Sequence, residues 1–341
     1  MRLFDGHNDT LLRCVDEENS VDAMRSREDG HLDIERAREA GLVGGFFAAF
    51  APSPEMPDPV VEPDSYRFPV APTPDLADAR ESVYRMLELL HRADREIDDF
   101  RVVTTPGDLD ACFDGNAVGA VPHIEGAEAV APDLSNLDFL HGAGVRSLGV
   151  VWSRPNEFGH GVPFEYPSDN DTGPGLTDAG RRLVRACEER GILVDGAHMN
   201  AATLRDALAE LSGPMAVTHT GAHAVSPHSR NLTDDQLRAV AESGGVIGVT
   251  FGATSYADEP DPQAGATAAD IAEHVAHIAD VVGVEHVALG SDFDGAGLVD
   301  DISDVRDVSV LLDEFRERGF GEREVEKIAG GNWRRLLARV L

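Results

Sequence analysis

Two stretches decide the fold of this protein: Ile192-Leu193-Val194-Asp195-Gly196-Ala197-His198 and Met215-Ala216-Val217-Thr218-His219. Each is a short apolar run typical of a buried strand, and each ends in a histidine. Residues 201–211, which lie between them, carry apolar residues at helical spacing. A strand, a helix and a second strand in this order form the repeating unit of a parallel sheet. We therefore expect His198 and His219 to lie at matching ends of two parallel strands.

The same alternation extends along the chain. Eight apolar runs predict strands over Leu3–Asp5, Val43–Phe50, Ala117–His123, Val145–Val151, Ile192–Asp195, Met215–Thr218, Val246–Phe251 and His286–Gly290. Six stretches predict helices over 75–98, 177–189, 201–211, 233–242, 268–281 and 304–317, some with a capping residue such as Thr177 or Thr233. Eight strands alternating with helices predict an α/β fold, a closed (β/α)₈ TIM-type barrel.

The domain organisation follows from the absence of internal repeats and composition shifts. We predict a single domain over residues 1–341, interrupted by a proline-rich, acidic segment at about 51–74. So many prolines favour an extended excursion after the second strand, either a lid or a surface loop.

The charge balance limits the partners of the protein. The chain has 62 acidic and 29 basic residues, a net charge of −33, and Lys327 is the only lysine. Long-range repulsion argues against nucleic acids and anionic membranes as partners. An acidic surface almost without lysine suits a cytoplasm of high salt, where charges are strongly screened, so we predict a halophilic protein.

The cysteines and the chain ends indicate the compartment. Cys14, Cys112 and Cys187 are far apart and form no CxxC pair, which favours buried thiols in a reducing compartment. We find no signal peptide, membrane span or lipid-anchor tail, and expect a cytoplasmic protein.

Metal-binding residue types fall at the carboxyl ends of five predicted strands, the edge where (β/α)₈ barrels build active sites. No GxGxxG, GxxxxGK[ST] or GxSxG motif competes with them. Each residue alone is explained by turn or surface polarity, but together they predict a metal site. Imidazole and carboxylate ligands without cysteine suit Zn²⁺, with Mn²⁺ or Co²⁺ as substitutes. These residues are His7, Asp9, Glu125, His198, His219 and Asp292.

In their order along the chain these residues resemble the membrane dipeptidase (renal dipeptidase) family of the amidohydrolase superfamily. The resemblance rests on Asp5-Gly6-His7-Asn8-Asp9, Gly290-Ser291-Asp292-Phe293-Asp294-Gly295, His228-Ser229-Arg230-Asn231 and Gly330-Gly331-Asn332. It covers nearly the whole chain, and the acidic composition would make the protein a haloarchaeal member.

The resemblance implies a zinc-dependent dipeptidase with two Zn²⁺ ions. His7 and Asp9 would bind one ion, His198 and His219 would bind the other, and Glu125 would bridge them. A hydroxide between the ions would attack the peptide carbonyl of a dipeptide. The family also suggests a homodimer.

The resemblance further implies roles at the reacting bond. Asp292 would accept the proton of the attacking water and pass it to the leaving amine. Arg230 would bind the free carboxylate of the dipeptide and thereby limit the length of the substrate.

One position departs from the family pattern. Members such as the mammalian renal enzyme carry a histidine after the fourth strand that polarises the substrate carbonyl, whereas this chain has Trp152. The indole N–H is still a donor, and Asn156 is a candidate second contact. The tryptophan leaves open a related amidohydrolase acting on N-acyl amino acids, lactones or cyclic amides. A catalytically silent metal- or ligand-binding protein is the other alternative.

Three other histidines receive structural interpretations. His274 and His277 lie three residues apart in a helical stretch and are expected to face solvent. His123 lies two residues before Glu125 and is expected to support the site through a hydrogen bond.

Overall fold

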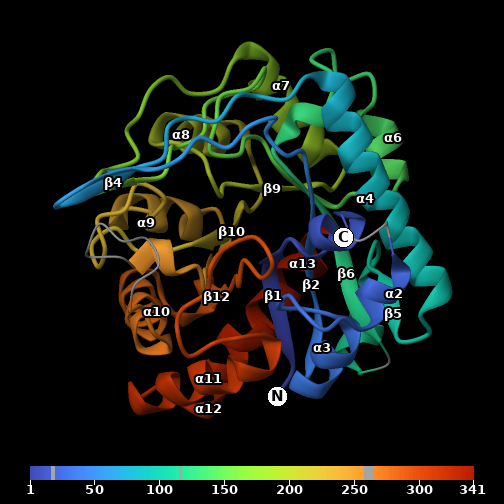
Figure 1. Ribbon diagram of the computed structural model, residues 1–341, viewed down its shortest axis with the longest axis vertical. Helices are drawn as coiled ribbons and strands as arrows, with labels where there is room; N and C mark the ends of the chain where they lie inside the picture. The colour runs from blue at the N-terminus through green and yellow to red at the C-terminus, as the bar shows by residue number, and fades with distance from the viewer. Residues whose placement is uncertain (17–19, 116, 257–264) are drawn as a thin grey trace.

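Eight parallel strands form the centre of the computed structural model, which describes residues 1–16, 20–115, 117–256 and 265–341 (Figure 1). The strands neighbour one another in chain order, and every pair is parallel. The sequence prediction of an α/β barrel is confirmed, since each of the eight predicted runs overlaps one strand. The strands are β1 Leu3–Asn8, β2 Leu42–Phe50, β6 Val118–Glu125, β7 Ser147–Gly149, β9 Leu193–Asp195, β10 Ala216–Thr220, β11 Val246–Val249 and β12 Val287–Leu289.

Backbone hydrogen bonds between the first and last strands close the barrel at the carboxyl edge. The N–H of Asp9 donates to the carbonyl of Phe293 at 2.8 Å, and the N–H of Asp292 donates to that of His7 at 3.0 Å. Glu125 and His219 belong to their strands, because parallel pairing continues beyond the predicted ends. Strand pairing therefore holds these site residues directly.

Helices surround the strands (Figure 1). The six predicted helices are present, and the predicted Thr177 cap is confirmed, because its side chain accepts from the N–H of Gly180. Several shorter helices and strand β5 (Phe100–Val102), which pairs with β6, were not expected. The helices are α1 Thr10–Asp16, α2 Val21–Arg25, α3 Ile34–Ala40, α4 Leu76–Glu96, α5 Pro106–Phe113, α6 Leu137–Gly142, α7 Asp178–Glu189, α8 Ala201–Glu210, α9 Asp234–Glu242, α10 Ala268–Val282, α11 Val308–Glu317, α12 Glu322–Glu326 and α13 Asn332–Val340.

Helix α13 closes the amino-terminal end of the barrel. Trp333 is fully buried, its indole N–H donates to the carbonyl of Leu289 at 2.8 Å, and its ring contacts that of Phe46. Phe4 belongs to the same apolar cluster. Apolar side chains therefore fill this end of the barrel.

The proline-rich segment is more ordered than its composition suggests. It contains a hairpin of β3 (Val60–Glu62) and β4 (Ser65–Arg67), and β4 pairs with β8 (Glu165–Tyr166). Figure 1 shows the hairpin projecting from the barrel. Tyr66 anchors it, because its hydroxyl donates to the carbonyl of Thr254 at 3.0 Å.

Two sequence-based expectations concern the remaining chain. Cys14, Cys112 and Cys187 are buried and form no disulfide, as expected. Within the described ranges, no helix has the length and apolar character needed to span a bilayer.

Candidate metal centre and active site

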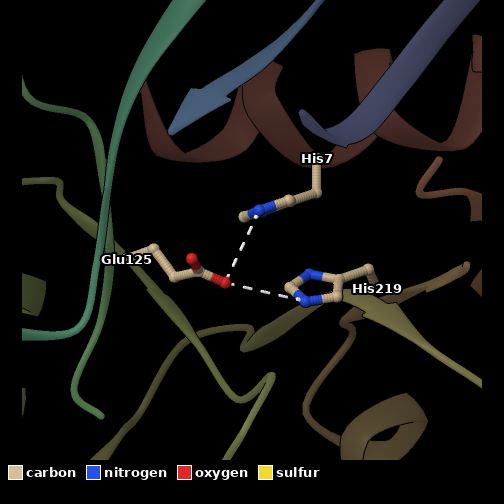
Figure 2. Close-up of side chains that lie close together, drawn as sticks. All are labelled: His7, Glu125 and His219. Carbon is tan, nitrogen blue, oxygen red and sulfur yellow. Dashed lines mark ion pairs between the residues drawn. The ribbon is translucent and has the colours of Figure 1, made fainter. Parts of the chain in front are cut away.

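A cluster of histidines surrounds Glu125 at the carboxyl edge of the barrel. One carboxylate oxygen, Oε1, lies 3.0 Å from Nε2 of His198, 3.5 Å from Nε2 of His7 and 3.7 Å from Nε2 of His219. The Nε2 atoms of His198 and His219 are 2.9 Å apart. Figure 2 shows His7 and His219 converging on Glu125 from different strands. The barrel thus brings four of the sequence-predicted residues into one buried group.

Asp9 and Asp292 complete the cluster beside His7. Asp9 Oδ2 lies 3.4 Å from Nε2 of His7, and the ligand atoms of His7, Asp9 and Asp292 all lie within 4.8 Å of one another. Asp292 has a positive φ of 62°, a conformation that is uncommon for non-glycine residues. A Cβ at Gly295 would collide with the carboxylates of Asp9 and Asp292. Gly295 is therefore a site residue that sequence reasoning missed.

Hydroxyl groups orient two of the histidines. Thr218 has one hydroxyl hydrogen, and its Oγ1 lies 2.7 Å from Oδ2 of the buried Asp195 and 3.0 Å from Nδ1 of His219. If the hydroxyl donates to the carboxylate, it must accept from Nδ1–H, which leaves Nε2 of His219 unprotonated toward Glu125. Ser153 Oγ lies 2.8 Å from Nδ1 of His198. Ser153 follows Trp152 and Thr218 precedes His219 in the sequence, so their position next to predicted site residues was the only sign of their role.

The donor atoms fit a metal ion. Among the described residues, both ring nitrogens of His7 and Oδ1 of Asp9 are buried without a hydrogen-bond partner. Buried polar atoms without partners are costly, so such atoms at a convergent site indicate a missing ligand. Imidazole nitrogen and carboxylate oxygen are ligands of Zn²⁺ and similar divalent ions.

The electrostatics also favour a cation. Burial opposes charge on His7, but the negative charges of Glu125, Asp9 and Asp292 outweigh it and raise the pKa of His7 to about 10. Burial raises the pKa of Asp292 to about 6 and that of Glu125 well above its usual value. It lowers the pKa values of His198 and His219. Without an ion the cluster therefore retains protons, which a divalent cation would replace.

A cleft of about 380 Å³ opens onto the cluster. Arg230 lines the cleft and is only 7% exposed, and its guanidinium carbon lies 5.9 Å from the ring centre of Phe164. Burial lowers the pKa of Arg230 to about 10, which still leaves it cationic at neutral pH. The cleft therefore combines a metal-type cluster with a group suited to a carboxylate.

Trp152 forms part of an aromatic wall in this cleft. Its ring lies 5.3 Å from Phe50, 5.7 Å from Phe164 and 5.7 Å from His198, measured between ring centres. Buried Arg154 lies 5.1 Å from the Trp152 ring centre and is ion-paired with Glu128 at 2.9 Å. Neither Arg154 nor Glu128 was predicted from the sequence as a site residue.

Asn156 lies apart from the cluster. Its side-chain amide donates to the carbonyl of Val150 at 2.8 Å, and its oxygen accepts from the N–H groups of Phe158 and Gly159. It does not line the cleft that contains the cluster, within the part of the chain that is described. Through these hydrogen bonds Asn156 stabilises the conformation of its own loop.

The other histidines differ in their surroundings. His274 is 1% exposed, so the expectation that it faces solvent is wrong: its Nδ1 accepts from the N–H of Ala222 at 2.8 Å and its ring contacts Tyr256. His277 is partly exposed and pairs with Asp234. His123 lies beside the site, with Nδ1 3.0 Å from Oγ of Ser147.

Buried histidines and carboxylates at the carboxyl ends of the strands of a (β/α)₈ barrel are typical of metal-dependent hydrolases. The family model described as membrane dipeptidase, peptidase family M19, matches residues 1–340. The chain belongs to this family. It is thus a metallo-dipeptidase by class, a hydrolase that acts on peptide bonds.

Solved structures and relatives agree with the family. A dipeptidase named AC, a metallopeptidase of family M19, is 38% identical with a TM-score of 0.93, over 100% of this chain and 98% of that one. A Rhodobacter sphaeroides metallopeptidase, solved with a phosphinate mimic of L-Ala-D-Ala, is 36% identical with a TM-score of 0.93, over 100% and 99%. A Klebsiella pneumoniae relative, described as an uncharacterized protein in the pqqA 5′ region, is 37% identical over 70% of this chain and 89% of its own length.

Proposed function

We propose that this protein is a zinc-dependent dipeptidase that uses two Zn²⁺ ions. The main support is that the cluster around Glu125 and the buried guanidinium of Arg230 line one cleft of about 380 Å³. A cleft of this size, with a fixed carboxylate-binding group near the reacting centre, suits a substrate of two residues better than a long peptide. The solved relative that carries a phosphinate mimic of a dipeptide supports the same substrate class.

The ligand assignment follows the two sides of the cluster. His7 and Asp9 would hold one ion, His198 and His219 the other, and Glu125 would bridge them. Two such ions, when bound, would supply Lewis-acid chemistry: they would polarise a peptide carbonyl and make water more acidic. The hydroxyls of Ser153 and Thr218 would keep two of the imidazoles in the required orientation.

The protein supplies the proton transfer and the substrate contacts. Asp292 lies beside His7 and Asp9 and faces the cleft, so it would take the proton of the attacking water and return it to the leaving amine. Arg230 would pair with the terminal carboxylate, and Trp152 would form the wall next to His198.

Cleavage of a peptide panel tests the function. L,L and L,D dipeptides, matched tripeptides and N-acetyl amino acids are incubated in molar salt with zinc, before and after chelation. We expect amino acid release from dipeptides only, lost on chelation and restored by zinc. No release from any dipeptide by folded, zinc-loaded protein would contradict the proposal.

Trp152 favours one second candidate. Because the indole cannot polarise a carbonyl as an imidazole would, a related amidohydrolase acting on N-acyl amino acids, lactones or cyclic amides is the alternative. Turnover of those compounds in place of dipeptides would support it. The halophilic character, the cytoplasmic location, the homodimer and the single-domain organisation stay predictions, and maximal activity at molar KCl is the test of the first.

A further inference from the structure

The cleft that contains Arg230 holds a second arginine, which comes from a different part of the barrel. Arg13 belongs to α1, one turn after Asp9, and lines the same cleft. Helix α1 follows β1, whereas the loop of Arg230 follows β10, three places away around the eight-stranded barrel. The cluster lies between these two sides, since it takes His7 from β1 and His219 from β10.

Arg13 is an exposed residue that a main-chain hydrogen bond holds in place. Its Nε donates to the main-chain carbonyl of Asp294 at 3.2 Å. The carboxylate of Asp294 is already engaged, because it forms an ion pair with Arg27 and accepts from the hydroxyl of Thr10 and the N–H of His31. Across the described ranges, no carboxylate lies within ion-pair distance of Arg13 or of Arg230.

Arg13 and Arg230 thus give the cleft two guanidinium groups, each able to bind a carboxylate of the ligand. The terminal carboxylate of a dipeptide accounts for Arg230. With that carboxylate bound and the peptide carbonyl at the cluster, the first residue of the dipeptide extends toward β1, where Asp9, Leu12 and Arg13 line the cleft. A side-chain carboxylate on this residue would meet Arg13, and its methylene groups would meet Leu12.

We infer that the preferred substrates are dipeptides whose first residue is acidic, with Arg13 binding the side-chain carboxylate. This inference rests on the proposed dipeptidase function and adds the substrate class to it. Guanidinium groups pair well with carboxylates because their geometry allows two parallel hydrogen bonds. Gln has the shape of Glu without its charge, so the two residues isolate the electrostatic contribution.

The test compares Glu-Ala with Gln-Ala, and Ala-Glu with Ala-Gln, at one salt concentration and one metal loading. For the native protein we expect kcat/KM for Glu-Ala to exceed that for Gln-Ala about fivefold, the size of effect typical of a partly exposed ion pair. Arg13→Met should reduce this ratio to one or below, and Arg13→Gln should do the same. Arg334→Met is the matched control, because it removes the same charge from α13 at the opposite end of the barrel and should keep the ratio.

The outcomes separate the inference from the proposed function. Cleavage of neutral dipeptides without a preference for Glu-Ala would overturn the inference alone, and so would a preference that survives Arg13→Met. A preference confined to Ala-Glu would overturn the placement of the acidic residue. If metal-loaded protein cleaves none of the four peptides, nor Ala-Ala, the dipeptidase proposal fails and the inference fails with it.

Discussion

The two sides of the cluster are prepared differently for a ligand. On the β9–β10 side, hydroxyl groups hold the Nδ1 atoms of His198 and His219 at 2.8 and 3.0 Å. On the β1 side, neither ring nitrogen of His7 has a hydrogen-bond partner among the described residues. His7 is instead fixed by packing, with its ring centre 4.0 Å from that of His219 and 5.5 Å from that of His123.

This difference shows that one barrel can position its metal-binding histidines in two ways. The hydroxyl contacts restrain the imidazoles of His198 and His219 before any ion arrives. His7 lies in a strongly negative surrounding, and its ring nitrogens have no hydrogen-bond partner among the described residues, so a cation would relieve both conditions. We therefore expect substitutions on the β1 side to affect chemistry and stability, and substitutions of the hydroxyls to affect metal affinity.

The largest effect should come from Asp292, on the β1 side. Asp292→Asn removes the proposed proton acceptor while keeping the side-chain size, so kcat for dipeptide hydrolysis should fall about 10³-fold. Steady-state kinetics with the metal content measured in parallel checks this. Asp300→Asn is the control, because Asp300 is exposed on the same loop and should leave kcat unchanged. An Asp292→Asn enzyme within tenfold of the native kcat would contradict the role.

Removing the metal should lower the stability of the protein, mainly because the ring nitrogens of His7 then have no ligand to bind. At free zinc about a thousandfold above Kd, each bound ion adds about 4 kcal/mol to the free energy of unfolding, which corresponds to roughly 6 °C in Tm for a chain of this length. Chelation should therefore lower Tm by that amount or more in a thermal melt. His7→Ala should show a smaller drop, and an equal drop in both proteins would show that His7 binds no ion.

Substitution of Thr218 tests the role of the hydroxyl groups on the β9–β10 side. Thr218→Val keeps the shape but loses the link between Asp195 and His219, so zinc affinity should fall between about 10- and 100-fold. Thr218→Ser should restore it. Competition with a chromophoric chelator measures the affinity without relying on activity. Unchanged affinity in Thr218→Val would remove the distinction between the two sides.

The smallest expected effect concerns His274, a buried histidine away from the cluster. Burial lowers its pKa to about 3 from the usual 6.5. Below pH 6.5 the unfolded chain binds a proton that the folded protein excludes, so the free energy of unfolding falls as the pH falls. From pH 6.5 to 5 this residue should account for a loss of about 2 kcal/mol.

Urea unfolding at pH 7 and pH 5 measures this loss. His274→Asn keeps an acceptor for the N–H of Ala222 and cannot titrate, so its stability should decline less between the two pH values. An identical decline in both proteins would mean that His274 is protonated in the folded state.

Sequence periodicity predicted the eight barrel strands, but it did not predict strand β5 or the burial of His274. The eight strands are visible as apolar runs because buried parallel strands are apolar on both faces. Strand β5 was missed because Arg101 at its centre interrupts the apolar run. His274 was misread because helical spacing alone does not reveal which face the helix packs against, and Tyr256 covers it here.

The sequence by itself determined the barrel, the order of the site residues and the family, because strand and helix patterns are local and motifs remain in register along the chain. Only the tertiary structure decided that Glu125 lies among three imidazoles, that Thr218 links His219 to Asp195, and that Arg13 and Arg230 line one cleft. These relations join residues far apart in the chain. Their distances depend on how the eight strands close into a ring, which no local pattern specifies.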